Sequence, residues 1–243
     1  IVQFTPLAES LTSRKVVDFL NLYFDRMVEQ LIRHDATIDK FIGDGIFASF
    51  GLQDDGAYRA VSAAAAMIKA LPELRKITGL DIHTRIGIHS GHVILGDIGS
   101  QHHRRDFTLI GDNVNIASRL EGLARRDGIL ISHATYKMIK SKVKVIPTQP
   151  LKLKGIENPV QAYLVTAVKP YPKEKTQLRR KFRKTIEPPY QTRAVRLDST
   201  VTQTLQANLC AVSDSDAPDT AERVQEESES TSLTAEAKIT TIC

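Results

Sequence analysis

The sequence predicts an α+β fold, in which a largely antiparallel sheet carries helices on one face. Apolar residues recur at helical spacing in three long segments, residues 10–33, 55–77 and 112–126. The segments between them resemble pairs of strands joined by glycine-containing turns. Helices separated by hairpins favour this class over a doubly wound parallel sheet, in which single strands alternate with helices.

Residues 10–33 form the first predicted helix. Charged residues occupy one face, and the opposite face is apolar, with Val16, Phe19, Leu20, Tyr23, Phe24, Met27, Val28 and Leu31. Residues 37–50 then predict a hairpin, because two apolar runs flank the turn residues Gly43, Asp44 and Gly45. The first helix is therefore expected to pack on the core, beside this hairpin.

Residues 55–77 predict a second helix, which is rich in alanine and suited to close packing on a sheet. A second hairpin is predicted from residues 82–88 and 93–98, with its turn at Ser90 and Gly91.

Residues 107–110 predict another strand, and Asp112 or Asn113 is expected to cap the helix that runs to about residue 126. Shorter elements follow, namely a strand at residues 129–131, a helix capped by Ser132, and strands near Val143 and Ala162.

The chain divides into a folded domain, residues 1–167, and a tail, residues 168–243. The tail is first rich in lysine, arginine and proline and then acidic and rich in serine and threonine, so we expect it to be disordered. Cys210 and Cys243 both lie in this tail, which indicates a reducing, cytoplasmic setting. No apolar stretch is long enough to cross a membrane.

The formal net charge of +5 and the pI near 9.2 raise the possibility of nucleic-acid binding. The basic runs at residues 102–105 and 173–184 are not interleaved with the aromatic residues that stack on bases. They also contain no recognised binding motif. We therefore expect no nucleic-acid partner.

Two short segments carry polar residues suited to a nucleotide. Lys40 and Asp44 place a cation on a strand and a carboxylate in the turn that follows, although Asp-Gly is also ordinary turn chemistry. Asn115 and Arg119 are four positions apart, so they share one face of the predicted helix. An amide and a guanidinium side by side suit a sugar and a phosphate, which need directional donors and delocalised charge.

Five segments in order resemble the catalytic domain of class III adenylyl and guanylyl cyclases. They are IVQFT, DKFIGD, RIGIHSG, DFTLIGDNVNIASRLE and LKLKGIENPVQAYLV, at spacings similar to those of the family. The resemblance covers residues 1–167 and implies a ferredoxin-like βαββαβ core with additional strands. It also implies that the chain is the cytoplasmic catalytic part of a longer parent protein, whose regulatory domains lie elsewhere, and it leaves open whether that parent is anchored in a membrane.

The resemblance implies a base-recognition pair and a catalytic pair. Lys40 and Thr108 match the positions that recognise the base. Because guanylyl cyclases usually carry Glu and Cys there, Lys40 favours ATP. Asn115 matches the residue that orients the ribose. Arg119 matches the residue that stabilises charge at the α-phosphorus while the 3′-hydroxyl attacks and pyrophosphate leaves.

The resemblance also implies two divalent ions per site, Mg²⁺ or Mn²⁺, with Asp44 as a ligand. Ile1 would offer its backbone carbonyl to a metal, and Phe4 and Thr5 would lie beside the triphosphate. The family uses a second aspartate immediately before the segment that matches Ile1. The chain is therefore expected to be truncated within its first strand.

The predicted function is adenylyl cyclase activity, the conversion of ATP to 3′,5′-cyclic AMP and pyrophosphate in cyclic-nucleotide signalling. In the family, the metal ligands and the base-recognising residues of one site come from different chains. This chain carries both sets, so the resemblance implies a head-to-tail homodimer. Two alternatives stay open, an inactive cyclase-like module that binds nucleotide and dimerises, and a guanylyl cyclase.

Overall fold

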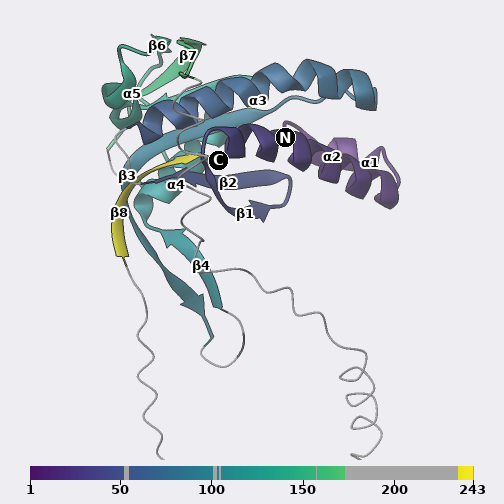
Figure 1. Ribbon diagram of the computed structural model, residues 1–243, viewed down its shortest axis with the longest axis horizontal. Helices are drawn as coiled ribbons and strands as arrows, with labels where there is room; N and C mark the ends of the chain where they lie inside the picture. The colour runs from purple at the N-terminus through teal and green to yellow at the C-terminus, as the bar shows by residue number, and fades with distance from the viewer. Residues whose placement is uncertain (52–54, 101–102, 104, 157, 173–234, 243) are drawn as a thin grey trace, which may run out of the picture. The chain divides into compact units, whose positions relative to one another are not determined.

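A mixed sheet of eight strands forms the centre of the fold (Figure 1). The computed structural model describes residues 1–51, 55–100, 103, 105–156, 158–172 and 235–242, all of which belong to one structural unit. The strands are β1 Thr37–Ile42, β2 Gly45–Phe50, β3 Arg85–Gly99, β4 Arg105–Ile110, β5 Gly128–Ser132, β6 Val143–Pro147, β7 Ala162–Val168 and β8 Ala235–Ile242. The helices are α1 Phe4–Glu9, α2 Ser13–Arg33, α3 Gly56–Thr78, α4 Asp112–Leu123 and α5 His133–Ile139.

The strand order is β1-β2-β8-β3-β5-β7-β6, and β4 pairs with the far end of β3. Every pairing is antiparallel except that of β3 with β5, which is parallel. The antiparallel-rich α+β class predicted from the sequence is therefore confirmed.

The helices α2 and α3 pack together over one face of the sheet (Figure 1). The apolar stripe of α2 is buried as its spacing predicts, and Thr12 caps the helix by accepting from the Lys15 amide. The main core lies between these helices and the sheet, with Phe19, Tyr23, Met27, Leu31, Phe50, Val61, Leu71, Leu74, Ile86, Ile88 and Ile131 among its buried members. Ser132 also caps α5 as predicted, accepting from the Thr135 amide at 3.2 Å.

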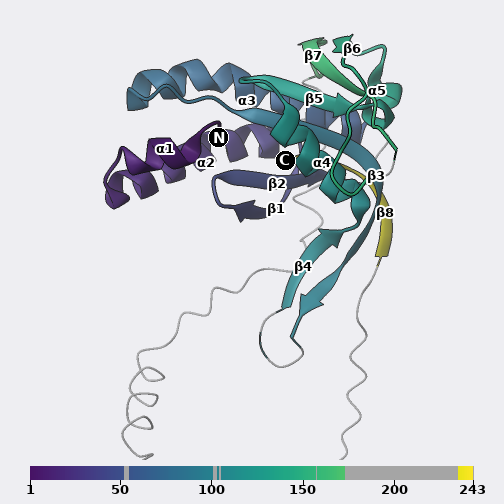
Figure 2. The ribbon, with the colours of Figure 1, turned by 180° about the vertical axis from the view of Figure 1, so that it is seen from behind.

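The helix α4 lies on the opposite face, in front of the sheet in Figure 2. Strand side chains alternate between faces, so Ile86 and Ile88 point into the main core whereas Gly87 faces α4. Leu120 of α4 and Leu130 of β5 belong to a separate apolar cluster on this second face. The expectation that all helices would cover one face is therefore wrong for α4.

The strand β3 is continuous from Arg85 to Gly99, so the hairpin predicted at Ser90 and Gly91 is wrong. β8 pairs along this part of β3 and keeps the chain extended. Gly91 serves close packing instead of a turn, because a β-carbon there would lie 2.3 Å from Cγ of Asn113 on α4. The observed hairpin joins β3 to β4 farther along the chain (Figure 1).

Residues 235–242 form β8, between β2 and β3, although the sequence assigned them to a disordered tail. Ile242 is 2% exposed, and the Thr240 hydroxyl lies 2.8 Å from that of Ser90. The basic and acidic parts predicted for residues 173–234 lie outside the described residues. Within the described part of the chain, no helix is both long and apolar enough to span a bilayer.

Candidate active site

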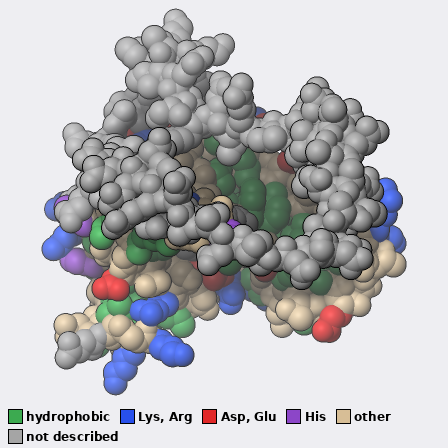
Figure 3. Space-filling view, turned by 90° about the horizontal axis from the view of Figure 1, so that it is seen from below, with side chains coloured by type: hydrophobic (Ala, Val, Ile, Leu, Met, Phe, Trp, Pro, Cys, Tyr) green, Lys and Arg blue, Asp and Glu red, His purple; other side chains and the backbone are tan. Residues whose placement is uncertain are grey.

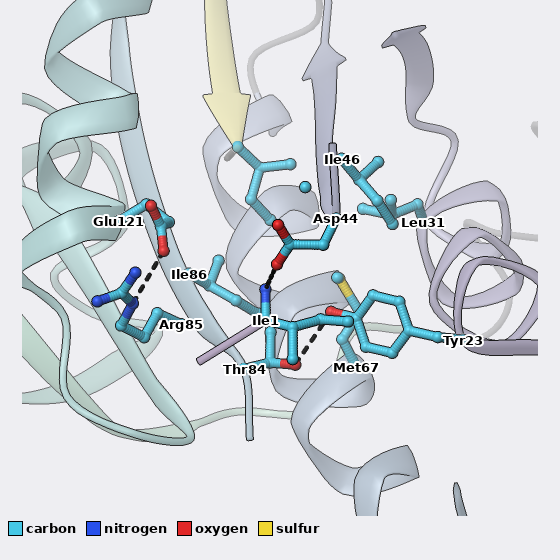
Figure 4. A pocket seen from close by; sticks show the side chains of 12 residues that line it. Ile1, Tyr23, Leu31, Asp44, Ile46, Met67, Thr84, Arg85, Ile86 and Glu121 are labelled. Atoms are coloured by element: carbon cyan, nitrogen blue, oxygen red, sulfur yellow. Dashed lines mark hydrogen bonds and ion pairs between the residues drawn. The ribbon is translucent and has the colours of Figure 1, made fainter. Parts of the chain in front are cut away.

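Asp44 lies in the tight turn between β1 and β2, at the wall of a small cavity (Figure 4). Gly43 precedes it with φ of 59°, a left-handed conformation that suits glycine. The Ile1 ammonium group donates to Asp44 Oδ2 at 2.6 Å. The resemblance predicted that Ile1 would offer its backbone carbonyl to a metal, and Ile1 lies beside the predicted metal ligand Asp44 in this cavity.

Two further pairs complete this cavity (Figure 4). The Tyr23 hydroxyl lies 3.0 Å from that of Thr84, and burial raises the pKa of Tyr23 to about 12. Tyr23 therefore stays neutral and acts as a structural hydrogen-bonding group instead of an acid or base. Arg85 Nε donates to Glu121 Oε1 at 2.9 Å, so that carboxylate already has a cationic partner.

The donor set around Asp44 fits a divalent ion that is shared with a nucleotide. The Asp44 side chain is 28% exposed at the wall of the cavity, so an ion from solvent can reach its carboxylate. Among the described residues no three His, Cys, Asp or Glu side chains gather closely enough to enclose a metal. Mg²⁺ is commonly held by one or two carboxylates together with substrate phosphates, so Asp44 meets the protein's part of this requirement.

The segment that follows Ile1 turns into α1. Gln3 adopts φ of 53°, a left-handed conformation that is unusual for a residue other than glycine, and its side chain accepts from Arg126 at 2.6 Å. Phe4 packs against the main core, whereas Thr5 is exposed on the first turn of α1. Of the two residues expected beside a triphosphate, Thr5 is thus the one with a free approach from solvent.

Lys40 and Thr108 converge on one carboxylate, that of Asp39. The Thr108 hydroxyl donates to Asp39 at 2.9 Å from Oδ1 and 3.1 Å from Oδ2, and Lys40 Nζ lies 3.4 Å from Oδ1. The Leu109 amide also donates to Asp39 Oδ2, at 3.2 Å. The sequence predicted Lys40 on β1 and Thr108 on β4 as a base-recognition pair. Both side chains contact the same carboxylate, that of Asp39.

A β-bulge explains why two consecutive residues of β1 can meet. Ile38 pairs with Ala48 and Lys40 pairs with Phe47, so Asp39 is the extra residue in the strand. A bulge interrupts the alternation of side chains and re-aims one of them. Asp39 and Lys40, consecutive residues at this bulge, form an ion pair. The sequence reasoning missed Asp39, because no residue pattern signalled the bulge.

The helix α4 carries Asn115 and Arg119 as predicted, one turn apart. Asn115 is exposed and Arg119 is partly buried. The Arg119 guanidinium lies 3.5 Å from the position that a β-carbon of Gly155 would occupy. The loop around Gly155 thus forms one wall beside this arginine.

Buried polar contacts fix the start of α4. Asn113 accepts from His89 Nε2 at 2.8 Å and donates to the His92 carbonyl at 2.7 Å. His89 Nδ1 lies 2.8 Å from the Ser132 hydroxyl. Burial lowers the pKa of His89, so the neutral ring is the favoured form. The prediction that Asp112 or Asn113 caps α4 is wrong, because the cap position is Gly111 and no side chain hydrogen-bonds there; Asn113 makes this link to His89 instead.

The structure brings Lys40 together with Thr108, Ile1 with Asp44, and Asn115 with Arg119. Within the described residues, no hydrogen bond or ion pair links Asp44 to Lys40, Thr108 or Arg119. The carboxylate turn and the base-recognition pair are therefore not joined by direct polar contacts within one copy.

Comparison with known proteins agrees with this geometry. The sequence model of the Adenylate and Guanylate cyclase catalytic domain family matches residues 1–167. Adenylate cyclase 1 of Rhizobium meliloti (strain 1021) is 34% identical over 177 residues, covering 69% of this chain and 26% of the relative. The chain thus spans about a quarter of that protein's length.

Solved structures of both substrate classes share the fold. The adenylyl cyclase CyaB from P. aeruginosa superposes with a TM-score of 0.64 at 35% identity, covering 69% of this chain and 90% of that one. The guanylyl cyclase Cya2 gives 0.65 at 35% identity, covering 69% and 88%. A match over residues 1–167, together with this shared fold, shows that the chain belongs to the adenylate and guanylate cyclase catalytic domain family, as a class III nucleotidyl cyclase domain.

Proposed function

We propose that this domain is an adenylyl cyclase, which converts ATP to 3′,5′-cyclic AMP and pyrophosphate. The observation that carries the proposal is the meeting of Lys40 and Thr108 at Asp39, across β1 and β4. An ammonium that can only donate and a hydroxyl that can accept match the base edge of adenine, which offers the N1 acceptor beside the N6 amino donor. The guanine edge presents the reverse order.

In this proposal Asn115 and Arg119 act on the sugar and the α-phosphate. The exposed amide of Asn115 can hydrogen-bond the ribose, which holds its 3′-hydroxyl in line with the α-phosphorus. Arg119 presents fixed donors to the non-bridging oxygens, where negative charge grows as the 3′-oxygen bonds to phosphorus and the bond to pyrophosphate breaks. The leaving pyrophosphate takes the bonding electrons, and the hydroxyl proton passes to solvent.

Asp44 is the proposed ligand for divalent metal, Mg²⁺ or Mn²⁺. When bound, two such ions would lower the pKa of the attacking hydroxyl and neutralise the triphosphate. Asp44 supplies a hard oxygen ligand at a turn whose backbone is fixed by Gly43. Thr5 is exposed where the first turn of α1 can approach a phosphate.

We infer a homodimer with shared sites, supported by the lack, among the described residues, of any direct polar contact between Asp44 and Lys40, Thr108 or Arg119 in one copy. The domain also exposes large apolar side chains on the β1–β2 hairpin and on the arm formed by β3 and β4, namely Phe41, Ile42, Ile94, Ile98, Phe107 and Ile110. Hydrophobic side chains reach the surface on the face seen in Figure 3 as well. Exposed apolar residues gathered in this way mark surfaces that bind another protein, here a second copy.

The second candidate is an inactive module that binds nucleotide, because among the described residues no three His, Cys, Asp or Glu side chains gather closely enough to enclose a metal. A variant with one aspartate added before Ile1 separates the two candidates. The addition supplies the second carboxylate that the resemblance to the family implies directly before Ile1.

The test measures cyclic AMP and cyclic GMP formed from ATP and GTP with Mn²⁺, for the chain and for the extended variant. We expect cyclic AMP as the main product, with higher turnover in the extended variant. Arg119→Ala and Asn115→Ala should each lower turnover by about 100-fold or more. The exposed Arg14→Ala on α2 is the matched control and should be unchanged.

Other outcomes have defined meanings. Cyclic GMP as the main product would replace ATP with GTP as the substrate. ATP binding without any product, even in the extended variant, would support the inactive module. Near-normal turnover in Arg119→Ala would remove the assignment of that residue.

A further inference from the structure

We propose that Asp39 determines base selectivity by fixing the direction of the Thr108 hydroxyl proton. The inference rests on the proposed function and adds to it a residue that does not touch the base. Three groups of this chain contact the Asp39 carboxylate. The Thr108 hydroxyl and the Leu109 amide donate hydrogen bonds to it, and the Lys40 ammonium forms an ion pair with it. Asp39 is therefore a positioning residue for both members of the base-recognition pair.

The direction of the Thr108 proton follows from hydrogen-bonding capacity. A threonine hydroxyl has one proton and two lone pairs, whereas an ionised carboxylate only accepts. With Asp39 at 2.9 Å and 3.1 Å, the proton points at the carboxylate, and the lone pairs of Oγ1 are left for a ligand. Thr108 then presents only an acceptor.

Burial stabilises the hydrogen bond from the Thr108 hydroxyl to Asp39. The Asp39 side chain is 6% exposed and Thr108 is 8% exposed, so little water competes for either group. Hydrogen bonds to a charged acceptor are also stronger than those between neutral groups. Turning the hydroxyl proton toward a ligand would leave a buried carboxylate short of a donor, which is costly.

An acceptor at Thr108 discriminates between the two purines. The N6 amino group of adenine donates a hydrogen bond, whereas O6 of guanine accepts one. With guanine bound, O6 and Thr108 Oγ1 would therefore face each other as two acceptors with no proton between them, which is unfavourable. Lys40 alone cannot make this distinction, because an ammonium donates equally well to N1 of adenine and to O6 of guanine. The Asp39–Thr108 pair therefore distinguishes the N6 amino group of adenine from O6 of guanine, which Lys40 cannot do.

The test compares Asp39→Asn with the unmodified chain. The Leu109 amide needs an acceptor, so it holds the new amide oxygen at the Oδ2 position and leaves the NH₂ group facing Thr108. The NH₂ group, at the Oδ1 position, donates to Oγ1, and the neutral amide oxygen at the Oδ2 position is a weaker acceptor than the carboxylate was, so the hydroxyl proton is released from its fixed direction and can turn to guanine O6. Asp39→Ala also frees this proton, by removing the carboxylate. Asp18→Asn, an exposed carboxylate on α2, is the matched control.

The readout is the ratio of dissociation constants for GTP and ATP, measured by displacement of a fluorescent nucleotide with Mn²⁺, so that it does not depend on turnover. We expect the unmodified chain and Asp18→Asn to favour ATP. Asp39→Asn and Asp39→Ala should lower the preference about 10- to 100-fold. Thr108→Val should lower it as well, and adding Asp39→Asn to Thr108→Val should have no further effect.

The outcomes separate this inference from the proposed function. If the chain prefers ATP and both Asp39 variants keep that preference, with their fold intact by circular dichroism, the inference is wrong and the proposed function stands. A further loss of preference when Asp39→Asn is added to Thr108→Val would show that Asp39 acts by another route, which also overturns it. If the chain binds neither nucleotide, or prefers GTP, the proposed function and the inference both fail.

Discussion

His89 shows how one buried side chain ties the sheet to α4. It is 7% exposed on β3, between Asn113 of α4 and Ser132, the cap of α5. Asn113 donates its NH₂ group to the His92 carbonyl, so its oxygen faces His89 and accepts from Nε2. The other ring nitrogen is then an acceptor for Ser132. A neutral imidazole satisfies both neighbours, and this contact holds Asn115 and Arg119 in place through the start of α4.

The stability of the domain should depend on pH through His89. Burial lowers the pKa of folded His89 below its ordinary value of 6.5, so the unfolded chain binds the proton more readily. The free energy of unfolding should therefore fall as pH decreases from 6.5 toward the folded pKa, by up to about 1.4 kcal/mol for each unit of lowering. His34, which burial also shifts downward in pKa, adds a contribution of the same sign.

Urea unfolding between pH 7.5 and 5 measures this effect. His89→Gln should weaken the pH dependence, whereas His92→Gln, at an exposed position on the same strand, should leave it unchanged. An equal slope in all three proteins would mean that His89 does not titrate in the way its burial implies.

Among the secondary-structure elements, β3 and its neighbours decide where the site residues lie. β3 pairs with β8, β5 and β4 along its length, and α4 packs directly on it. Gly87 permits this close approach, because a β-carbon there would lie 2.2 Å from the Glu121 nitrogen and 2.3 Å from the Ala117 carbonyl oxygen. Both contacts are backbone atoms of α4, so the helix itself would have to move.

Gly87→Ala should therefore destabilise the domain and displace α4. Overpacking of this kind costs about 1–3 kcal/mol in the free energy of unfolding. Gly122→Ala in α4 is the matched control, since nothing lies within 4 Å of its added carbon. The control should be neutral or more stable by about 0.5–1 kcal/mol. Equal stability of the two variants would contradict the packing of α4 on β3.

The strand β8 should contribute to stability although it lies far along the chain from its partners. Ile242 is fully buried in the main core beside residues of α3 and the sheet. Ile242→Ala should lower the free energy of unfolding by about 2–5 kcal/mol. Ile146→Ala, at a position that is 54% exposed on β6, should change it by less than about 0.5 kcal/mol. A matching small effect for Ile242→Ala would show that β8 does not hold its place in the sheet.

At the scale of the whole molecule, the proposed dimer gives each copy two half-sites. Asp44 lies at the β1–β2 turn with Ile1, whereas Lys40, Thr108, Asn115 and Arg119 form the other set. In a two-fold dimer one surface patch meets its partner symmetrically, so two equivalent sites would form. Each site would take its metal ligand from one copy and its base-recognition residues from the other.

Mixing two inactive variants tests this arrangement. In a mixed dimer of Asp44→Ala with Arg119→Ala, one site collects both defects and the other collects none. If half of the dimers are mixed, about a quarter of the original activity should return. Arg119→Ala mixed with Asn115→Ala is the matched control, since both defects lie in the same set and every site keeps one. Shared sites would be contradicted if activity returned in the control mixture, or if no activity returned in the mixture of Asp44→Ala with Arg119→Ala.

The sequence by itself determined the elements that local patterns encode. The apolar spacing of α2, the glycine turn between β1 and β2, and the polar face of α4 all appear where they were predicted. Residues four apart on a helix must share a face, so the spacing alone was enough to pair Asn115 with Arg119. The order of five segments was enough to identify the family, which the match over residues 1–167 confirms.

Only the tertiary structure decided three features. Ser90 and Gly91 resemble a turn, yet β8 keeps them extended, and the glycine is needed because Asn113 packs against it. Residues 235–242 look like part of a polar tail until the sheet supplies partners on both sides. A bulge, invisible in the residue pattern, brings Asp39 to Thr108. Periodicity reports the local conformation of a segment, whereas pairing partners and close contacts depend on residues far away in the chain, and so the fold had to supply them.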